Sequence, residues 1–263
     1  MRRPAVAGSF YPSRKENLEQ MLRKFTNPRK DERIVACVSP HAGYIYSGKT
    51  AGAVHSMLPD AETFVIVCPN HTGYGLPVAV STETWLTPLG KVESDLDFIK
   101  AMPKKIVAED EDAHIEEHSG EVQIPFLQFL HRDFKIVVIC LRLQDEETAK
   151  EVAGEILEAE KRVGRKIVVV ASSDMHHYLS DAECRKRDRI VIDAILSMDV
   201  AKYYKKIYEL DASVCGYGAI AVAMNYAIAK NAKAELVDYS TSGDVADKSF
   251  VVGYAGIVFR IGD

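Results

Sequence analysis

The stretch Ile167-Val168-Val169-Val170-Ala171-Ser172-Ser173-Asp174-Met175-His176-His177 joins a short apolar run to a polar end that carries two histidines. An apolar run of this length, rich in β-branched residues, is typical of a strand that is buried on both faces of a sheet. Two more runs end in the same way. Ile34–Val38 leads into Ser39-Pro40-His41, and Thr63–Cys68 leads into Pro69-Asn70-His71. The chain therefore repeats one pattern, in which a buried strand is followed by a histidine-bearing turn.

The rest of the chain also alternates between short apolar runs and longer amphipathic stretches. The further expected strands are Lys135–Leu141, Phe250–Phe259, Pro77–Val80 and Ala234–Tyr239. The expected helices are Arg14–Phe25, Lys49–Met57, Ser94–Ala101, Val122–His131, Glu146–Arg162, Asp181–Leu196 and Gly216–Ala229. This alternation predicts an α/β fold with a central, largely parallel or mixed sheet and helices on both faces. No linker, repeat or low-complexity block divides the sequence, so we expect residues 1–263 to form a single domain.

Composition argues against several classes of partner. The 263 residues carry 33 basic and 38 acidic side chains, a net charge of −5, which gives no electrostatic reason to expect a nucleic acid or an anionic membrane as partner. No apolar run approaches the length of about 20 residues that spans a bilayer. No run of signal-peptide type follows Met1-Arg2-Arg3-Pro4, so we expect a cytoplasmic protein. None of the five cysteines falls in a CxxC pair, which argues against a disulfide framework.

The histidines after the strands are the first candidates for a site. In an open parallel sheet, ligands bind in the crevice beyond the carboxyl ends of the strands. A single histidine after a strand is more often a loop residue or a helix cap than a ligand. Three such strand ends, with His41, His71 and His177, favour a shared pocket that is able to hold a metal. Pro40 and Pro69 fix the backbone before two of them, as a pre-organised ligand requires.

Cys215 is the candidate for a further ligand. It lies in Ser213-Val214-Cys215-Gly216-Tyr217-Gly218, at the entry to a helical run of small residues. The positive end of a helix dipole favours the thiolate, which is the form that binds metal or attacks an electrophile. The alternative is a small residue tolerated beside a tight glycine turn.

Other residues are candidates for supporting roles. The irregular region Thr82–Glu117 is expected to be a loop excursion that carries part of the site. His118 and Glu121 stand three apart at the start of a helix, where they would either orient a ligand or substrate from behind or charge-match the helix end. Tyr44 is a candidate for the pocket mouth, and His176 is a neighbour without an assigned role.

A rival interpretation comes from Gly43-Tyr44-Ile45-Tyr46-Ser47-Gly48-Lys49-Thr50, which matches the GxxxxGK[ST] phosphate-loop pattern. A phosphate cradle needs successive backbone N–H groups turned inward, which favours small residues, whereas the middle positions here hold two tyrosines and an isoleucine. We therefore expect no nucleotide as cofactor and keep nucleotide binding through Gly43–Thr50 as a remote alternative.

Segments spread over nearly the whole chain carry a resemblance to a known family. They are Arg3–Pro12, Pro40–Tyr44, Pro69–Gly73, Glu117–Glu121, Ser172–Asp174, Cys215-Gly216 and Tyr239–Gly243. In these segments the sequence resembles the Memo family (mediator of ErbB-driven cell motility), whose prokaryotic members are called AmmeMemoRadiSam system protein B. Each segment alone is a weak signal, but the set is highly specific.

The resemblance implies a fold similar to that of class III extradiol dioxygenases, the LigB-like non-haem iron enzymes. In those enzymes two histidines and a glutamate hold Fe(II), and a further histidine acts as acid and base. In the Memo family the matching pocket has two histidines and a cysteine. Carried over, the resemblance implies that His41, His71 and Cys215 are metal ligands, with Asp174 and His177 as the remaining polar pair and His177 at the acid/base position.

The cysteine changes the expected chemistry. A thiolate is softer than a carboxylate and is easily oxidised, which shifts the preference towards copper, zinc or a low-potential iron. We expect divalent iron or copper as cofactor, with zinc as a further option. The expected function is metal binding, with metal-dependent oxidation of a small molecule as one hypothesis. The alternative is a non-catalytic protein that binds metal, a peptide or a partner in the same pocket. The family's prokaryotic name implies partners that include a radical SAM protein and its associated family protein.

Overall fold

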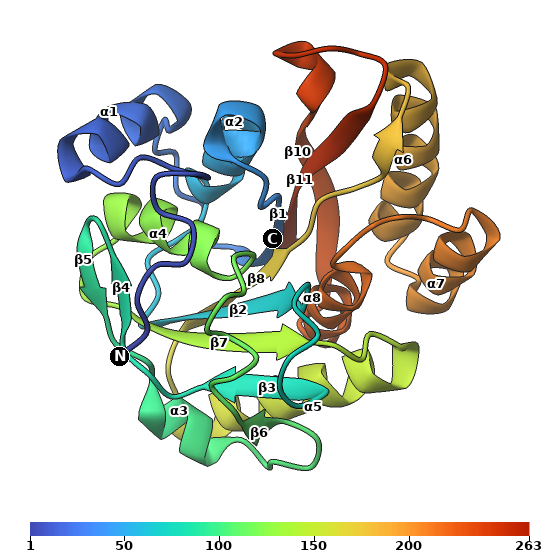
Figure 1. Cartoon of the computed structure of the whole chain (residues 1–263). Helices are drawn as coiled ribbons and strands as arrows, with labels where there is room; N and C mark the ends of the chain where they lie inside the picture. The colour runs from blue at the N-terminus through green and yellow to red at the C-terminus, as the bar shows by residue number, and fades with distance from the viewer. Residues whose placement is uncertain (263) are drawn as a thin grey trace.

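Neighbouring parallel strands form the centre of the sheet in the computed structural model, which describes residues 1–262. Their order is β1 (Ile34–Ser39), β8 (Ile167–Ser172), β2 (Thr63–Pro69) and β7 (Lys135–Leu141). Figure 1 shows β2 and β7 side by side, with their arrowheads at the same end. Parallel pairing therefore brings the carboxyl ends of these strands to one edge of the sheet.

On each side of this centre, the next strand runs in the opposite direction. β7 pairs antiparallel with β3 (Val78–Ser81), which pairs with the short β6 (Ala108–Glu109). β1 pairs antiparallel with β11 (Val251–Ile261), which also pairs with β10 (Ala232–Thr241) and with β9 (His177–Leu179). The sheet is thus mixed around a parallel centre, and the predicted α/β class is confirmed.

Alternate residues of each central strand enter two separate cores. On β8, Val169 and Ala171 belong to one cluster of buried side chains, whereas Val168 and Val170 belong to the other. All of these side chains are fully buried. Both faces of the sheet are therefore covered, which explains why the central strands appear in the sequence as continuous apolar runs.

Helices supply the two covering layers (Figure 1). One face carries α3 (Leu96–Ala101), α5 (Glu146–Val163), α6 (Asp181–Leu196), α7 (Val200–Glu209) and α8 (Tyr217–Ala229). The other carries α1 (Lys15–Phe25), α2 (Tyr44–His55), the 3-10 turn η1 (Glu121–Gln123), α4 (Ile124–Leu130) and the hairpin of β4 (Trp85–Thr87) and β5 (Gly90–Val92). A further 3-10 turn, η2 (Ser242–Asp244), follows β10. No helix within residues 1–262 has the length and apolarity needed to cross a membrane.

The expected elements are present, most of them with small shifts at their ends. β7 and α6 have the predicted bounds, and the other expected strands differ by one or two residues at an end. The helix expected at Lys49–Met57 is the exception, because α2 already begins at Tyr44. The sequence interpretation missed α7, whose first turn is capped by the Asp199 carboxylate accepting from the N–H of Lys202. It also missed the β4–β5 hairpin, because strands of three residues are too short to show an alternating or apolar pattern.

The segment Gly43–Thr50 does not have the conformation of a phosphate loop. The segment is helical from Tyr44 onward, so its backbone N–H groups enter the ladder of α2 instead of a loop. The Thr50 hydroxyl donates to the Asp238 carboxylate at 2.7 Å. Gly48 contacts the ring of Phe25, so helix packing accounts for this glycine.

The contact of α2 with Phe25 yields a test of this packing. A Cβ built on Gly52 lies 2.3 Å from the carbonyl oxygen of Phe25, and a backbone atom cannot move aside cheaply. We expect Gly52→Ala to lower the free energy of unfolding by about 1–3 kcal/mol. Gly154→Ala in α5 is the matched control, since its Cβ meets no atom within 4 Å; this change should be neutral or stabilise by up to about 1 kcal/mol. Urea denaturation of both variants measures the difference, and equal stabilities would contradict the packing argument.

Candidate metal centre

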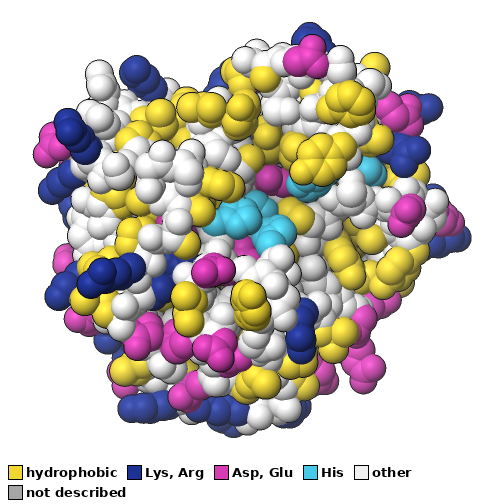
Figure 2. Space-filling model, viewed as in Figure 1, with side chains coloured by type: hydrophobic (Ala, Val, Ile, Leu, Met, Phe, Trp, Pro, Cys, Tyr) yellow, Lys and Arg dark blue, Asp and Glu magenta, His cyan; other side chains and the backbone are white. Residues whose placement is uncertain are grey.

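The central strands deliver polar side chains to one edge of the sheet. His41 lies two residues beyond β1, His71 two beyond β2 and Asp174 two beyond β8. Because β1, β8 and β2 are parallel neighbours, these positions converge. Cys215 arrives from the chain just before α8. In Figure 2, histidine side chains (cyan) gather in a hollow near the middle of the face shown.

His41, His71 and Cys215 bring three possible ligand atoms within 4.8 Å of one another. The Cys215 sulfur lies 3.1 Å from Nε2 of His41, and the ring centroids of His41 and His71 are 5.2 Å apart. Both imidazoles line a cavity of about 540 Å³. Its wall and rim also include Phe10, Tyr46, His118, His177, Tyr178 and Phe250. The structure therefore brings together the three residues for which the sequence predicts a ligand role.

Glu117 holds His71 at two points. One carboxylate oxygen accepts from the backbone N–H of His71 at 2.5 Å, and the other lies 2.9 Å from Nδ1 of the ring. Burial alone would raise the pKa of Glu117, but the hydrogen bonds from His71 and Ser119 outweigh it and hold that pKa at about 2. The carboxylate is thus charged and only accepts, so Nδ1 of His71 donates to it; in the neutral ring this tautomer places the lone pair on Nε2.

The sequence interpretation missed Glu117. It lies in the irregular region before η1, where no strand or helix pattern indicates which way a side chain points. His118, the next residue, stacks on His71 with 4.8 Å between ring centroids, and its Nδ1 lies 3.5 Å from Glu117. His71, Glu117 and His118 form a second group with possible ligand atoms within 4.8 Å. The Glu117 oxygens already accept from His71 and Ser119, so the group with Cys215 is the better donor set.

His41 is the most enclosed of the candidate ligands, at 2 % exposure. Its backbone N–H donates to the Asp174 carboxylate at 2.8 Å, and Nδ1 lies 2.9 Å from the hydroxyl of Ser172. Burial, and then the neighbouring His118 and His71, lower the pKa of His41 well below its usual value. The ring is therefore neutral, as an imidazole ligand must be.

The electrostatics of Cys215 differ from the expectation. The start of α8 was expected to favour the thiolate, but burial, followed by the nearby Asp174 carboxylate, raises the pKa of the Cys215 thiol above its usual value. The backbone N–H of Asp174, 3.2 Å from the sulfur, only partly offsets this. Burial outweighs the dipole because a helix end acts weakly compared with removal of a charge from water. A coordinated cation reverses this balance, because a ligating thiol loses its proton.

Asp174 and His177, the polar pair that the resemblance implies, both border the cavity, and their hydrogen bonds go to other partners. Burial raises the pKa of Asp174 to about 6, against the hydrogen bond from the His41 N–H, which lowers it. His177 is instead oriented by Ser213, whose carbonyl accepts from Nδ1 at 2.7 Å. A carbonyl only accepts, so Nδ1 of His177 carries a proton, and in the neutral ring the lone pair is on Nε2. Ser213 is a further residue that the sequence interpretation did not identify.

Glu121 and Tyr44 do not line the cavity, contrary to the pocket position expected for Tyr44 and to one of the two roles considered for Glu121. The buried Glu121 carboxylate anchors the N-terminal segment: it pairs with the Arg2 guanidinium at 2.5 Å and accepts from the Tyr11 hydroxyl and the Ala5 N–H. Tyr44 is buried and donates its hydroxyl to the Val122 carbonyl at 2.6 Å.

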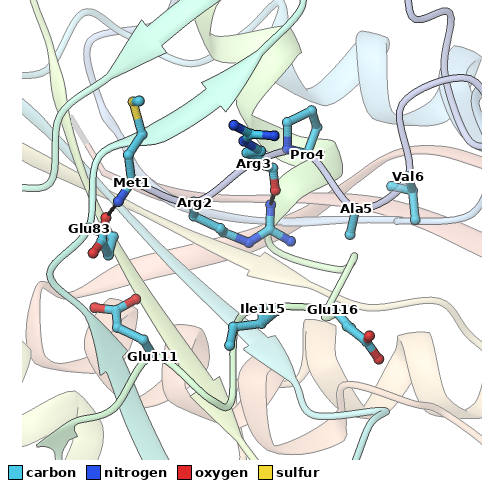
Figure 3. Close-up of a pocket in the computed structure, with 10 residues that line it drawn as sticks. All are labelled: Met1, Arg2, Arg3, Pro4, Ala5, Val6, Glu83, Glu111, Ile115 and Glu116. Carbon is cyan, nitrogen blue, oxygen red and sulfur yellow. Dashed lines mark hydrogen bonds and ion pairs between the residues drawn. The ribbon is translucent and has the colours of Figure 1, made fainter.

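The N-terminal segment borders a cavity of its own. The volume of this cavity is about 580 Å³. Figure 3 shows Met1 to Val6 along one side and Glu83, Glu111, Ile115 and Glu116 around it. None of these residues lines the histidine cavity. This cavity is therefore separate from the candidate metal centre.

His176 points away from the cavity, although it adjoins His177 in the chain. Its Nδ1 lies 2.7 Å from the Asp188 carboxylate, which also accepts from the Tyr239 hydroxyl at 2.6 Å. His176 and Asp188 are both buried. These contacts anchor the chain between β8 and β9, so a structural role accounts for His176.

The fold and the site together define an α/β protein with a histidine and cysteine cluster at the carboxyl ends of its central strands. A model of the family described as "Memo-like protein" matches residues 2–258, and this chain belongs to the Memo family. It is 74 % identical over 261 residues to a "MEMO1 family protein" of Archaeoglobus fulgidus, which covers 99 % of this chain and 100 % of the relative. A "MEMO1 family protein" of Methanosarcina mazei is 48 % identical, with 98 % of each chain covered.

A solved structure shares the fold. The crystal structure of the uncharacterized protein JW3007 from Escherichia coli K12 matches with a TM-score of 0.54 over 88 % of this chain and 100 % of that chain. The two sequences are 13 % identical, so the likeness concerns the fold alone.

The low pKa of Glu117 yields a pH prediction. A carboxyl group whose pKa is about 2 in the folded chain, against an ordinary value of 4.5, stabilises the fold above the ordinary value and loses that contribution as the pH falls towards 2. We therefore expect the free energy of unfolding to fall more steeply between about pH 5 and pH 3 in the wild type than in Glu117→Gln. Urea denaturation across this range measures the slope. The exposed neighbour Glu116 provides the control, because Glu116→Gln should keep the wild-type slope; a Glu117→Gln slope equal to it would contradict the prediction.

Proposed function

We propose that the pocket binds a transition-metal ion through Nε2 of His41, Nε2 of His71 and the sulfur of Cys215. The observation that carries this proposal is the approach of three donor atoms, from three distant segments, to within 4.8 Å of one another. Two imidazoles and a thiolate suit iron, copper or zinc better than magnesium or calcium, which prefer oxygen ligands.

The surroundings of His71 support the proposal. A histidine that binds metal commonly donates its other ring N–H to a carboxylate, which fixes the tautomer and the ring orientation. Glu117 accepts from Nδ1 of His71 in this way. A buried carboxylate that binds both the backbone and the ring of one histidine costs desolvation, and a ligand role for that histidine explains the arrangement.

Elemental analysis tests the metal site. We expect protein purified without affinity metals, or reloaded after chelation, to hold about one iron, copper or zinc ion per chain. His41→Ala and Cys215→Ala should each weaken binding by at least about 10- to 100-fold, since loss of even an outer partner has that effect. In the cobalt-substituted protein, the sulfur-to-metal charge-transfer band should disappear only in Cys215→Ala.

His131→Ala is the matched histidine control. His131 pairs with Asp60 and does not line the cavity, so its loss should leave the metal content unchanged. Equal binding by the wild type, His41→Ala and Cys215→Ala would refute the site.

We further propose that the loaded protein is an oxidoreductase that acts on a small molecule in the cavity. A bound iron or copper ion supplies the redox chemistry. His177 takes up a proton at Nε2, because Ser213 keeps its other ring nitrogen protonated. Asp174, with a pKa of about 6, holds the backbone of His41 through the His41 N–H. The rings of Tyr46, Tyr178 and Phe250 line the cavity, so a substrate bound there would contact them.

Oxygen consumption by the metal-loaded protein with a panel of catechols, against anaerobic controls, tests this activity. We expect His177→Ala to lower turnover by about 10²- to 10⁴-fold, the usual contribution of a general acid or base, while its metal content stays at the wild-type level. No turnover across the panel would refute the oxidoreductase proposal and would leave the metal site to be judged by its own measurement.

A binding role without catalysis is the second candidate. Tyr178 and Phe250 at the cavity mouth are each 75 % exposed, and large exposed aromatic side chains often mark a contact surface. A peptide, or the radical SAM protein and its associated family protein, would then bind at this mouth. If Tyr178→Ala and Phe250→Ala abolish binding to these partners and Cys215→Ala and His177→Ala leave it intact, this candidate replaces the oxidoreductase.

A further inference from the structure

We propose that Ser172 is a positioning residue that keeps the proton of the His41 ring on Nδ1, so that Nε2 presents a lone pair to the pocket. The purpose of this arrangement rests on the proposed metal site, whereas the position of the proton is a property of the metal-free chain. The two can therefore be tested separately.

Ser172 has three polar neighbours, which together use the one hydrogen and both lone pairs of its hydroxyl. Its Oγ lies 2.7 Å from the carbonyl of Ser119, 2.8 Å from Nε2 of Gln123 and 2.9 Å from Nδ1 of His41. A carbonyl only accepts and an amide NH₂ only donates, while a hydroxyl has one hydrogen and two lone pairs. The hydrogen of Ser172 therefore goes to Ser119, and one lone pair takes the Gln123 amide. The remaining lone pair faces His41, which must donate.

The hydrogen-bond partners of the Gln123 side chain fix which end of its amide is nitrogen and which is oxygen. Its Nε2 also donates to the carbonyl of Pro40 at 3.0 Å, while its Oε1 lies 2.8 Å from Nε2 of His55 on α2. A flipped amide would set two oxygens against each other at Pro40. Burial holds the pKa of His55 at about 4, so this ring is neutral and uses its single N–H towards Gln123.

The chain of donors thus runs from His55 through Gln123 to Ser172 and is shielded from water. His55, Gln123 and Ser172 are all at most 1 % exposed. In such surroundings an unmade hydrogen bond is costly, so each proton has one favoured place. These hydrogen bonds connect α2, η1 and β8, and the last of them fixes which nitrogen of the His41 ring carries the proton.

On its other side, the His41 ring faces the sulfur of Cys215, 3.1 Å from Nε2. A proton on Nε2 would occupy the position that a metal ion needs and would leave no donor between the ring and Ser172. Ser172 therefore selects the tautomer that can act as a ligand through Nε2.

Long-range ¹H–¹⁵N spectra of the metal-free protein, in which the two ring nitrogens of His41 are resolved, measure the tautomer directly. We expect Nδ1 to be protonated and Nε2 unprotonated in the wild type. In Ser172→Ala the preference should be lost, with averaged nitrogen signals or a shift to Nε2–H. Cobalt affinity should fall by about 10- to 100-fold in the same variant, as is usual when the partner of a ligating histidine is removed.

Ser39→Ala is a closely matched control. Ser39 pairs with Ser172 across β1 and β8 and is equally buried, yet within residues 1–262 its hydroxyl has no hydrogen-bond partner. This variant should keep both the tautomer and the cobalt affinity of the wild type.

A wild-type proton on Nε2 would overturn the proposal without any variant. So would a Ser172→Ala protein that keeps the proton on Nδ1, or one that loses the preference yet binds cobalt as the wild type does. If the wild type takes up no metal while Ser172 sets the tautomer, the positioning role stands and the proposed metal site fails.

Discussion

The parallel pairing of β1, β8 and β2 is the constraint on which the remainder of the molecule depends. In this arrangement Ser39 lies beside Ser172, and the chain leaves the strands at the same level. His41 and His71 then approach each other, although 29 residues of the sequence lie between them. If one strand slipped by a residue, its buried side chains would change faces and its histidine would leave the cluster. The strand register that fills the core is thus also the register that brings the pocket residues together.

The pocket lies at the seam between the two covering layers. His41 leads into α2 on one face of the sheet, whereas Cys215 leads into α8 on the other. Glu117 and His118 come from the irregular chain before η1. His41, Glu117 and Ser172 are buried there, and a buried polar group needs a hydrogen-bond partner. Ser172, Gln123, Glu117 and Ser213 supply those partners, so the hydrogen-bond network sets which ring nitrogens remain free.

Much of the fold could be predicted from the sequence because the central strands are buried on both faces and their signal is local. The same logic placed His41 and His71 together, since strand-end positions converge in any parallel sheet. Glu117 and Ser213 could not be found this way, because their roles depend on contacts with residues more than 30 positions away. For Glu121, local spacing was misleading. Its distance from His118 in the sequence suggested that both face the same side, but its carboxylate pairs with the buried Arg2 guanidinium. The thiol of Cys215 was misjudged because burial cannot be read from a helix start.

The assembly of the cluster from several distant segments has a thermodynamic consequence. An ion held by donors from β1, β2 and the approach to α8 has no equivalent site in the unfolded chain, so its binding free energy is added to that of folding. Loading would then stabilise the molecule as a whole, in proportion to the logarithm of the free ion concentration, rather than only the turns that touch it. In a cell, the supply of the ion would influence how long each copy of the chain survives.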